Sequence, residues 1–187
     1  MVRLFCILIL RLIGWRTVYA PPPGSKTVIL VYPHTSNWDF PLGLLFRFQY
    51  PMFIHWAAKD TLFRGPVGAF FRHIGGIPIN RRAPAGIVGQ IVERFARSAS
   101  FHVVITPEGT RARTAYWKDG FYRIARQAGV PVGLGFIDYG SRTLGIERWI
   151  ELSGDEAADL ETLRAYYAGK RARYPEQAGE IRFKPRG

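Results

Sequence analysis

A histidine and an aspartate that could form a catalytic pair lie five residues apart in the segment 33–40, whose sequence is PHTSNWDF. His34 can act as a base near neutral pH, and the carboxylate of Asp39 can orient its imidazole. On a regular helix, five residues turn the chain by about 500°, so the two side chains would point apart. They can meet if His34 lies in a loop that enters a helix, because Ser36 and Asp39 have the S-x-x-D spacing of a capping box. The alternative is a capped helix with a solvated histidine.

A second polar segment, PEGTRAR at residues 107–113, directly follows the most strand-like run of the chain. Gly109 allows backbone amides to approach a ligand closely, and Arg111 and Arg113 can donate charge-assisted hydrogen bonds to a phosphate. Glu108 can orient an arginine or accept a hydrogen bond from a substrate hydroxyl. The alternative is a surface turn in which Glu108 pairs with a nearby arginine. Loops at strand ends often carry function, which favours a binding site.

A third segment, GGIPINRR at residues 75–82, places Arg81 and Arg82 after a short extended apolar run. Such a charge run is usually a solvated surface. All three segments, however, follow strand-like runs, and the ends of parallel strands lie along one edge of a sheet. Arg81 or Arg82 could then meet Arg111 at a single phosphate near His34.

Alternating strands and helices must position these segments. Apolar runs typical of strands occur at residues 27–32, 52–58, 77–81, 101–105 and 130–139, and segments typical of helices at 38–50, 66–73, 86–98 and 120–128. An alternating edge strand at 142–152 and a polar helix at 155–173 follow. This order predicts an α/β fold, a single-domain αβα sandwich around a largely parallel or mixed sheet.

The N-terminal segment is almost wholly apolar but contains Arg3 and Arg11. Its uninterrupted apolar run, residues 4–10, is far shorter than the roughly 20 residues that cross a bilayer. It suits a helix that lies in the membrane interface, with arginines reaching the head groups and Trp15 at the boundary. A buried core helix and a signal peptide are the alternatives. We expect residues 1–20 to form a membrane-associating helix and residues 21–187 to form the main domain.

The net charge of +12 and the sequence pI of about 10.3 require an anionic partner, surface or substrate. The rival to an enzyme is therefore a basic module that binds anionic membrane or nucleic acid, although recognised nucleic-acid motifs are absent. The single cysteine, Cys6, excludes an internal disulfide and a multi-cysteine metal site. His55, His73 and His102 lack an acidic neighbour at a useful spacing, so we expect them to be structural.

Taken together, the three polar segments resemble the motifs of the glycerolipid acyltransferases, which include glycerol-3-phosphate and lysophosphatidate acyltransferases. The family's H-x-x-x-x-D block resembles residues 34–39, its G-x-x-P-x-D-R block resembles 75–81, and its F-P-E-G-T-R-S block resembles 106–112. A proline-centred fourth block is similar to residues 130–132. The resemblance runs from about residue 25 to 140. The chain departs from it at Asn80, Thr106 and Ala112, where the family has Asp, an aromatic residue and Ser.

The resemblance implies that His34 is a general base and Asp39 its orienting partner. A fatty acyl group would move from an acyl thioester, acyl-CoA or acyl-carrier protein, to the hydroxyl of a phosphorylated lysolipid, with 1-acyl-glycerol-3-phosphate as the expected acceptor. Another lysolipid or glycerol-3-phosphate is the alternative acceptor, and a lipase-like hydrolysis by the same histidine is a third possibility. Because no G-x-S-x-G elbow presents a serine, we expect direct transfer without a covalent intermediate.

The resemblance also implies the substrate-binding residues, with Arg81 and Arg111 contacting phosphate and Glu108 with Gly109 in the acceptor site. The complete expected set is Asn80, Arg81, Arg82, Glu108, Gly109, Thr110 and Arg111. We expect no cofactor, no metal and no nucleic-acid partner. The expected location is an anionic membrane surface, the cytoplasmic face of the inner membrane.

Overall fold

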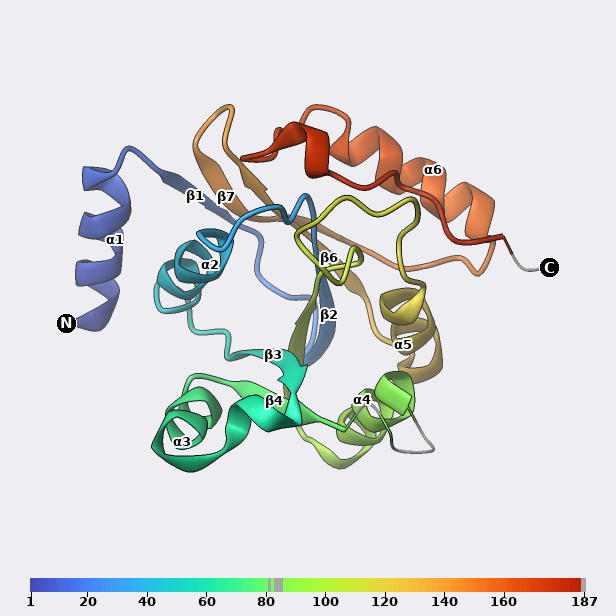
Figure 1. The fold of residues 1–187 in the computed structure, drawn as a ribbon, viewed down its shortest axis with the longest axis horizontal. Coiled ribbons are helices and arrows are strands. Elements are labelled where there is room, and N and C mark those ends of the chain that lie inside the picture. Colours follow the sequence, from blue (N-terminus) through green and yellow to red (C-terminus); the bar gives the residue numbers. More distant parts are fainter. Residues whose placement is uncertain (81, 83–85, 186–187) are drawn as a thin grey trace.

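The computed structural model describes residues 1–80, 82 and 86–185. The described chain contains a seven-stranded sheet with the order β1-β7-β6-β2-β5-β3-β4 (Figure 1). Neighbouring strands are parallel except for the antiparallel pair β6 and β7. The strands are β1 (Arg16–Tyr19), β2 (Lys26–Val31), β3 (Ile54–Lys59), β4 (Gly76–Ile79), β5 (Phe101–Ile105), β6 (Val132–Asp138) and β7 (Thr143–Ile150). The predicted α/β class with a largely parallel, mixed sheet is confirmed.

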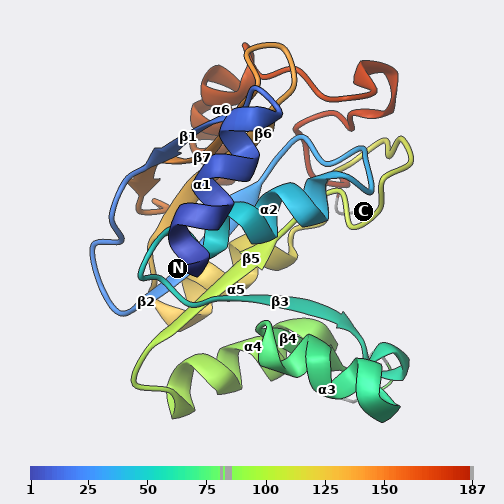
Figure 2. The ribbon, with the colours of Figure 1, turned by 90° about the vertical axis from the view of Figure 1, so that its left-hand side faces the viewer.

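Helices cover both faces of this sheet, as expected for an αβα sandwich. The α-helices are α1 (Val2–Leu12), α2 (Asp39–Arg47), α3 (Gly65–His73), α4 (Gly86–Arg97), α5 (Gly120–Ala128) and α6 (Glu156–Tyr167), with short 3₁₀ helices η1 (Asp60–Phe63) and η2 (Pro175–Gln177). Helices α1 and α2 lie on one side of the sheet (Figure 2), and α4, α5 and α6 lie on the other.

Alternation along β2 separates the two apolar cores. Val28 and Leu30 pack with residues of α4, α5 and α6, whereas Ile29 packs with Leu10 of α1 and Phe46 of α2. Successive side chains of a strand point to opposite faces of the sheet, so a strand that is apolar throughout must be covered on both sides. The continuous apolar run of β2 is thereby explained.

The carboxyl ends of four parallel strands lie at one edge of the sheet and position the polar segments. Leu30 of β2 pairs with Ile105 of β5, and Lys59 at the end of β3 pairs with Ile79 at the end of β4. The chain therefore leaves β2 toward His34 beside the point where it leaves β5 toward the turn 107–113. These two segments are adjacent because their strands are adjacent.

The outermost strand of the sheet, beside β7, differs from the prediction. We expected an edge strand at 142–152, but the short β1 pairs in parallel with β7 and forms that edge instead. A side chain at Gly145 would collide with the backbone of Val18, so the glycine allows β1 to approach. Residues 16–19 were expected to belong to the N-terminal helical segment and instead belong to the sheet.

The N-terminal helix is present and has two different faces. Cys6 and Leu10 are buried against the domain, whereas Leu4, Phe5, Leu8 and Leu12 are between 57% and 85% exposed. The alternative of a buried core helix therefore explains the face with Cys6 and Leu10 but not the exposed apolar face. Among the described residues, no helix combines the length and apolar character needed to span a membrane.

The C-terminal segment returns to the edge of the sheet that carries the polar loops. Helix α6 ends at Tyr167, before the predicted end at residue 173, and the chain then passes beside β6. The backbone N–H of Tyr139 donates to Arg171 O at 2.9 Å, and the backbone N–H of Tyr174 donates to Thr35 Oγ1 at 3.2 Å. Residues far apart in sequence thus meet at the end of β2.

Candidate active site

The structure brings His34 and Asp39 into direct contact. Nδ1 of His34 lies 2.9 Å from Oδ2 of Asp39, at a point where the His34 side chain is 15% exposed and the Asp39 side chain only 2%. Since Nδ1 faces the carboxylate, Nε2 is the nitrogen that can accept a proton from a substrate. The pair has the geometry of an orienting acid and a base.

The local turn explains why residues five apart can meet. The carboxylate of Asp39 accepts a hydrogen bond from the backbone N–H of Ser36 at 3.0 Å, and Ser36 Oγ accepts from the backbone N–H of Trp38 at 3.2 Å. This is the folded-back carboxylate that the S-x-x-D spacing predicts. The helix assignment differs slightly, because α2 begins at Asp39 and the preceding residues form a turn.

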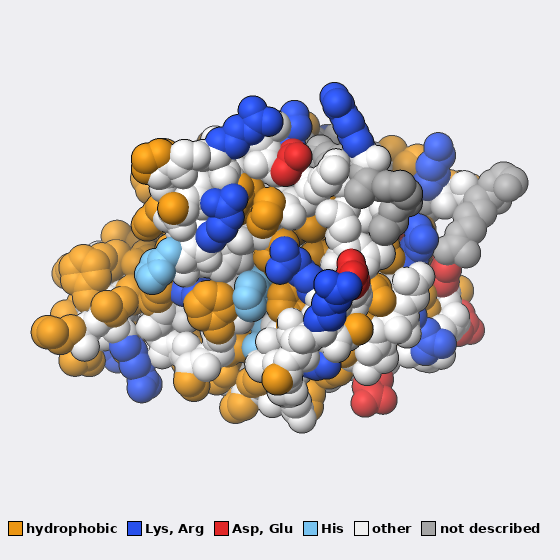
Figure 3. All heavy atoms as spheres, turned by 90° about the horizontal axis from the view of Figure 1, so that it is seen from below, with side chains coloured by type: hydrophobic (Ala, Val, Ile, Leu, Met, Phe, Trp, Pro, Cys, Tyr) orange, Lys and Arg blue, Asp and Glu red, His pale blue; other side chains and the backbone are white. Residues whose placement is uncertain are grey.

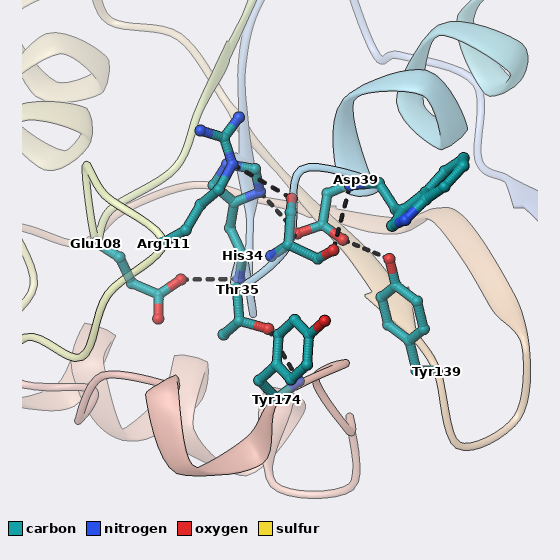
Figure 4. Close-up of polar contacts among 9 residues, drawn as sticks. His34, Thr35, Asp39, Glu108, Arg111, Tyr139 and Tyr174 are labelled. Atoms are coloured by element: carbon teal, nitrogen blue, oxygen red, sulfur yellow. Dashed lines mark hydrogen bonds and ion pairs between the residues drawn. The ribbon is translucent and has the colours of Figure 1, made fainter.

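A tyrosine that the sequence did not indicate completes the surroundings of Asp39. Tyr139, in the turn after β6, donates from its hydroxyl to Oδ1 of Asp39 at 2.7 Å (Figure 4). Burial, together with the hydrogen bond to Asp39, raises the pKa of Tyr139, so its hydroxyl remains a donor at neutral pH. The buried carboxylate of Asp39 thus accepts from His34, Ser36 and Tyr139.

Glu108 is buried behind the loop that carries His34. Glu108 is 1% exposed. Its two carboxylate oxygens accept hydrogen bonds from the backbone N–H groups of His34 at 2.8 Å and Gly179 at 2.9 Å. Burial raises the pKa of Glu108, and the two backbone hydrogen bonds oppose this rise. The geometry gives Glu108 the role of positioning the loop. Its expected contact with the acceptor stays a prediction.

Tyr32 links the C-terminal segment to the same loop. Its hydroxyl donates to Gly179 O at 2.9 Å, and burial, with a contribution from the charge of Glu108, raises the pKa of Tyr32 to about 12. Gly179 therefore contacts the site through both its N–H and its carbonyl. The C-terminal segment is part of the site although no motif in it indicates this.

Positively charged side chains lie at the same end of the sheet as the pair. Nε of Arg111 donates to Ser36 O at 3.3 Å, so its guanidinium contacts the loop that carries His34 (Figure 4). Gly109 has φ of +63°, and a Cβ built there would lie 2.5 Å from Nζ of Lys118. Lys59 ends β3 at the same edge of the sheet. Lys59 and Lys118 are cations outside the three polar segments.

The predicted residues of the third segment lie farther away. Asn80 follows β4, which is separated from β2 by β5 and β3, a lateral distance of roughly 14 Å. The Asn80 side chain accepts from the backbone N–H of Arg82 at 2.9 Å, and Arg81 lies outside the described residues. In the second segment, Thr110 Oγ1 accepts from the backbone N–H of Ala112 at 3.3 Å, within its own turn. A phosphate shared between the two arginine segments stays a prediction.

The remaining histidines lie away from the pair. Nδ1 of His102 is 2.8 Å from Thr27 Oγ1, and Nδ1 of His55 is 3.2 Å from His102 O. Burial lowers the pKa of both imidazoles. His73 is exposed at the end of α3. The positions of His55 and His102 fit the structural role that we expected, and for the exposed His73 that role stays a prediction.

A family model described as Acyltransferase matches residues 16–133, more than half of the chain. This chain belongs to the acyltransferase family. The match includes His34, Asp39 and the turn 107–113, and it ends before Tyr139 and Gly179. The expected membership from the three motifs is confirmed.

The fold of this acyltransferase is also similar to a solved structure. The 1-acyl-sn-glycerophosphate (LPA) acyltransferase PlsC from Thermotoga maritima superposes with a TM-score of 0.57 and 18% sequence identity, over 92% of this chain and 80% of that one. At this identity the similarity supports the fold. A comparison with curated proteins finds no match.

Proposed function

We propose that this acyltransferase moves a fatty acyl group from an acyl thioester, acyl-CoA or acyl-carrier protein, to the hydroxyl of 1-acyl-glycerol-3-phosphate. The observation that carries the proposal is the 2.9 Å contact between His34 Nδ1 and Asp39 Oδ2, with Arg111 hydrogen-bonded to Ser36 of the same loop. A base that is oriented by a carboxylate suits the activation of a hydroxyl, and an adjacent guanidinium suits the acceptor phosphate.

The transfer step follows from this geometry. Nε2 of His34 takes the proton of the acceptor hydroxyl while the oxygen attacks the thioester carbonyl carbon. The tetrahedral intermediate then collapses, the C–S bond breaks, and the imidazolium returns the proton to the leaving thiolate. Asp39 holds the imidazole orientation and stabilises the imidazolium. Base catalysis of this kind contributes about 10²–10⁴-fold, and the positioning of two substrates contributes further.

Hydrogen bonds within the turn 36–38 already occupy two of its backbone N–H groups, which are candidate donors to an oxyanion. The backbone N–H groups of Ser36 and Trp38 already donate to Asp39 and Ser36. Within the turn 36–38, Asn37 therefore supplies the candidate N–H for the developing oxyanion.

Direct transfer is favoured over a covalent acyl-enzyme. Ser36 is 4% exposed and its Oγ accepts from the backbone N–H of Trp38, while Cys6 is buried within α1, away from the pair. Burial also raises the pKa of the Cys6 thiol, which lowers its fraction of reactive thiolate. Neither side chain has the surroundings of an activated nucleophile.

The proposal includes a membrane location, the cytoplasmic face of the inner membrane. Hydrophobic side chains gather at the end of the molecule that α1 occupies (Figure 3). The exposed stripe of Leu4, Phe5, Leu8 and Leu12 suits insertion into the interface, and the net charge of +12 suits anionic lipid. The acceptor is itself a membrane lipid, so this location brings the pair to its substrate.

A thioester-consumption assay tests the proposal with glycerol-3-phosphate, 1-acyl-glycerol-3-phosphate, other lysolipids and lyso-ornithine lipid as acceptors. We expect thiol release that depends on acceptor and is fastest with 1-acyl-glycerol-3-phosphate. Free fatty acid without acceptor would indicate a hydrolase, and membrane or nucleic-acid binding without any thiol release would indicate a basic binding module. Either result would contradict the proposed reaction.

A further inference from the structure

A cavity lies beneath α1, away from the His34–Asp39 pair. Its volume is about 360 Å³, and it is bounded by α1, by the start of β1 and by the chain after α2. This volume is within the roughly 300–1,000 Å³ of typical small-molecule sites. It is large enough to admit a lipid head group.

The cavity is lined by three arginines and by no acidic residue. Arg3 and Arg11 come from α1, and Arg16 comes from β1. None of the three forms an ion pair with another residue that the structure describes. Three arginines that line one hollow favour an anionic ligand such as a phosphate, whose oxygens guanidinium groups can bind in pairs.

The floor of the cavity is polar and ordered by hydrogen bonds. Thr17 Oγ1 lies 2.9 Å from the hydroxyl of Tyr50 and 3.3 Å from Gln49 Oε1, and Gln49 Nε2 donates to Leu45 O at 3.1 Å. Gln49 is 4% exposed. The Tyr50 ring stacks on Tyr19 with centroids 4.0 Å apart, which holds the phenol in place. The hollow therefore has a fixed polar base under its charged rim.

We propose that this cavity binds the phosphate head group of an anionic phospholipid in the membrane. The inference rests on the membrane association proposed above. Leu4, Phe5 and Leu8 are exposed on the same helix from which Arg3 and Arg11 line the cavity. A single lipid can thus place its phosphate in the cavity while its acyl chains remain with the apolar stripe. Binding here secures α1 to the membrane at a site separate from the acceptor site.

Vesicle binding by the full chain tests the proposal. The variant Arg11→Gln/Arg16→Gln is compared with Arg94→Gln/Arg123→Gln, which removes the same charge from α4 and α5 on the opposite face of the sheet. We expect the first variant to bind vesicles of phosphatidylcholine and phosphatidylglycerol roughly 30-fold more weakly than wild type. The second variant should bind nearly as wild type does. Both should bind pure phosphatidylcholine vesicles as wild type does, because the apolar stripe is intact.

Equal losses in the two variants would overturn the proposal, since they would reflect net charge alone. Equal wild-type binding to both vesicle types would overturn it while leaving membrane association in place, and failure to bind any vesicle would overturn both. Acyl transfer to a short-chain soluble acceptor measures the reaction independently. If the double variant fails to fold, Arg11→Gln alone is used, with about a fivefold loss expected.

Inorganic phosphate distinguishes a lipid site from a free-phosphate site. The indole N–H signal of Trp15, which lines the cavity, reports occupancy by NMR and is assigned with Trp15→Phe. We expect phosphatidylglycerol vesicles to displace phosphate from this cavity in the wild-type protein. Phosphate that is retained in the presence of saturating anionic vesicles would contradict a lipid occupant.

Discussion

The hydroxyl of Tyr139 donates a 2.7 Å hydrogen bond to the carboxylate oxygen of Asp39 that His34 does not contact. The Tyr139 ring packs edge-on against Trp15 with centroids 5.0 Å apart, so the phenol is held from behind. An ordered donor of this kind orients the Asp39 carboxylate and disperses its charge. Tyr139 therefore positions Asp39 within the proposed catalytic pair.

Replacing Tyr139 by Phe should lower kcat roughly tenfold, as expected for the loss of a hydrogen bond to a charged group. The acceptor KM should change little, because Tyr139 acts through Asp39 and not on the substrate. Steady-state kinetics measure both constants, with Tyr174→Phe as the control. A raised acceptor KM at unchanged kcat would contradict this role of Tyr139.

Arg111→Ala should raise the acceptor KM about 10–100-fold for phosphorylated acceptors, and much less for a neutral monoacylglycerol. The guanidinium of Arg111 donates from Nε to Ser36 O, in the loop that carries His34. Arg113→Ala, in the same exposed turn, is the matched control and should change neither KM. Equal changes with charged and neutral acceptors would remove the phosphate contact from Arg111.

Glu108→Ala should lower the free energy of unfolding by about 1–3 kcal/mol for each backbone N–H that loses its acceptor. It should also lower kcat, because the loop carrying His34 is no longer tied to Gly179. Acceptor KM should change little. Urea unfolding and steady-state kinetics measure these quantities. A Glu108→Ala variant with unchanged stability and a raised acceptor KM would contradict the positioning role and would indicate that Glu108 contacts the acceptor.

The protein should lose stability as the pH falls below the ordinary histidine value of 6.5, because burial lowers the pKa of both His55 and His102. The unfolded chain then binds protons that the folded chain excludes. The stabilisation is complete above that value and is lost as the pH falls through the folded-state pKa, by up to about 1.4 kcal/mol per pH unit for each histidine. The free energy of unfolding in urea should depend less steeply on pH for His102→Asn than for the wild type. The exposed His73→Gln variant should keep the wild-type dependence. Identical slopes in all three proteins would exclude the buried histidines as the cause.

The contact between His34 and Asp39 could be predicted from sequence because its geometry is local. Ser36 and Asp39 form their turn within four residues, and the strand before them fixes the position of His34 at the edge of the sheet. The alternation of strands and helices likewise predicted the layers. The adjacency of the segments at 34–39 and 107–113 required only that their strands be neighbours in a parallel sheet.

Residues that reach the site from other parts of the chain could not be predicted in this way. Tyr139 contacts Asp39 across 100 positions, and Gly179 contacts Glu108 across 71. Both contacts depend on β6 lying beside β2 and on the return of the chain after α6, which no local pattern encodes. The order of the sheet also separates Asn80 from His34, whereas the position of both segments after strand-like runs had predicted that they meet.

The measurement that tests the central claim most directly is thiol release by His34→Ala, with an acyl thioester and 1-acyl-glycerol-3-phosphate as substrates. His73→Ala serves as the control, and circular dichroism with urea unfolding verifies the fold of both variants. We predict that His34→Ala loses at least about 10²–10⁴-fold in kcat at unchanged stability, while His73→Ala keeps wild-type activity. Retention of most of the acyl transfer by a folded His34→Ala variant would contradict the assignment of this histidine as the base.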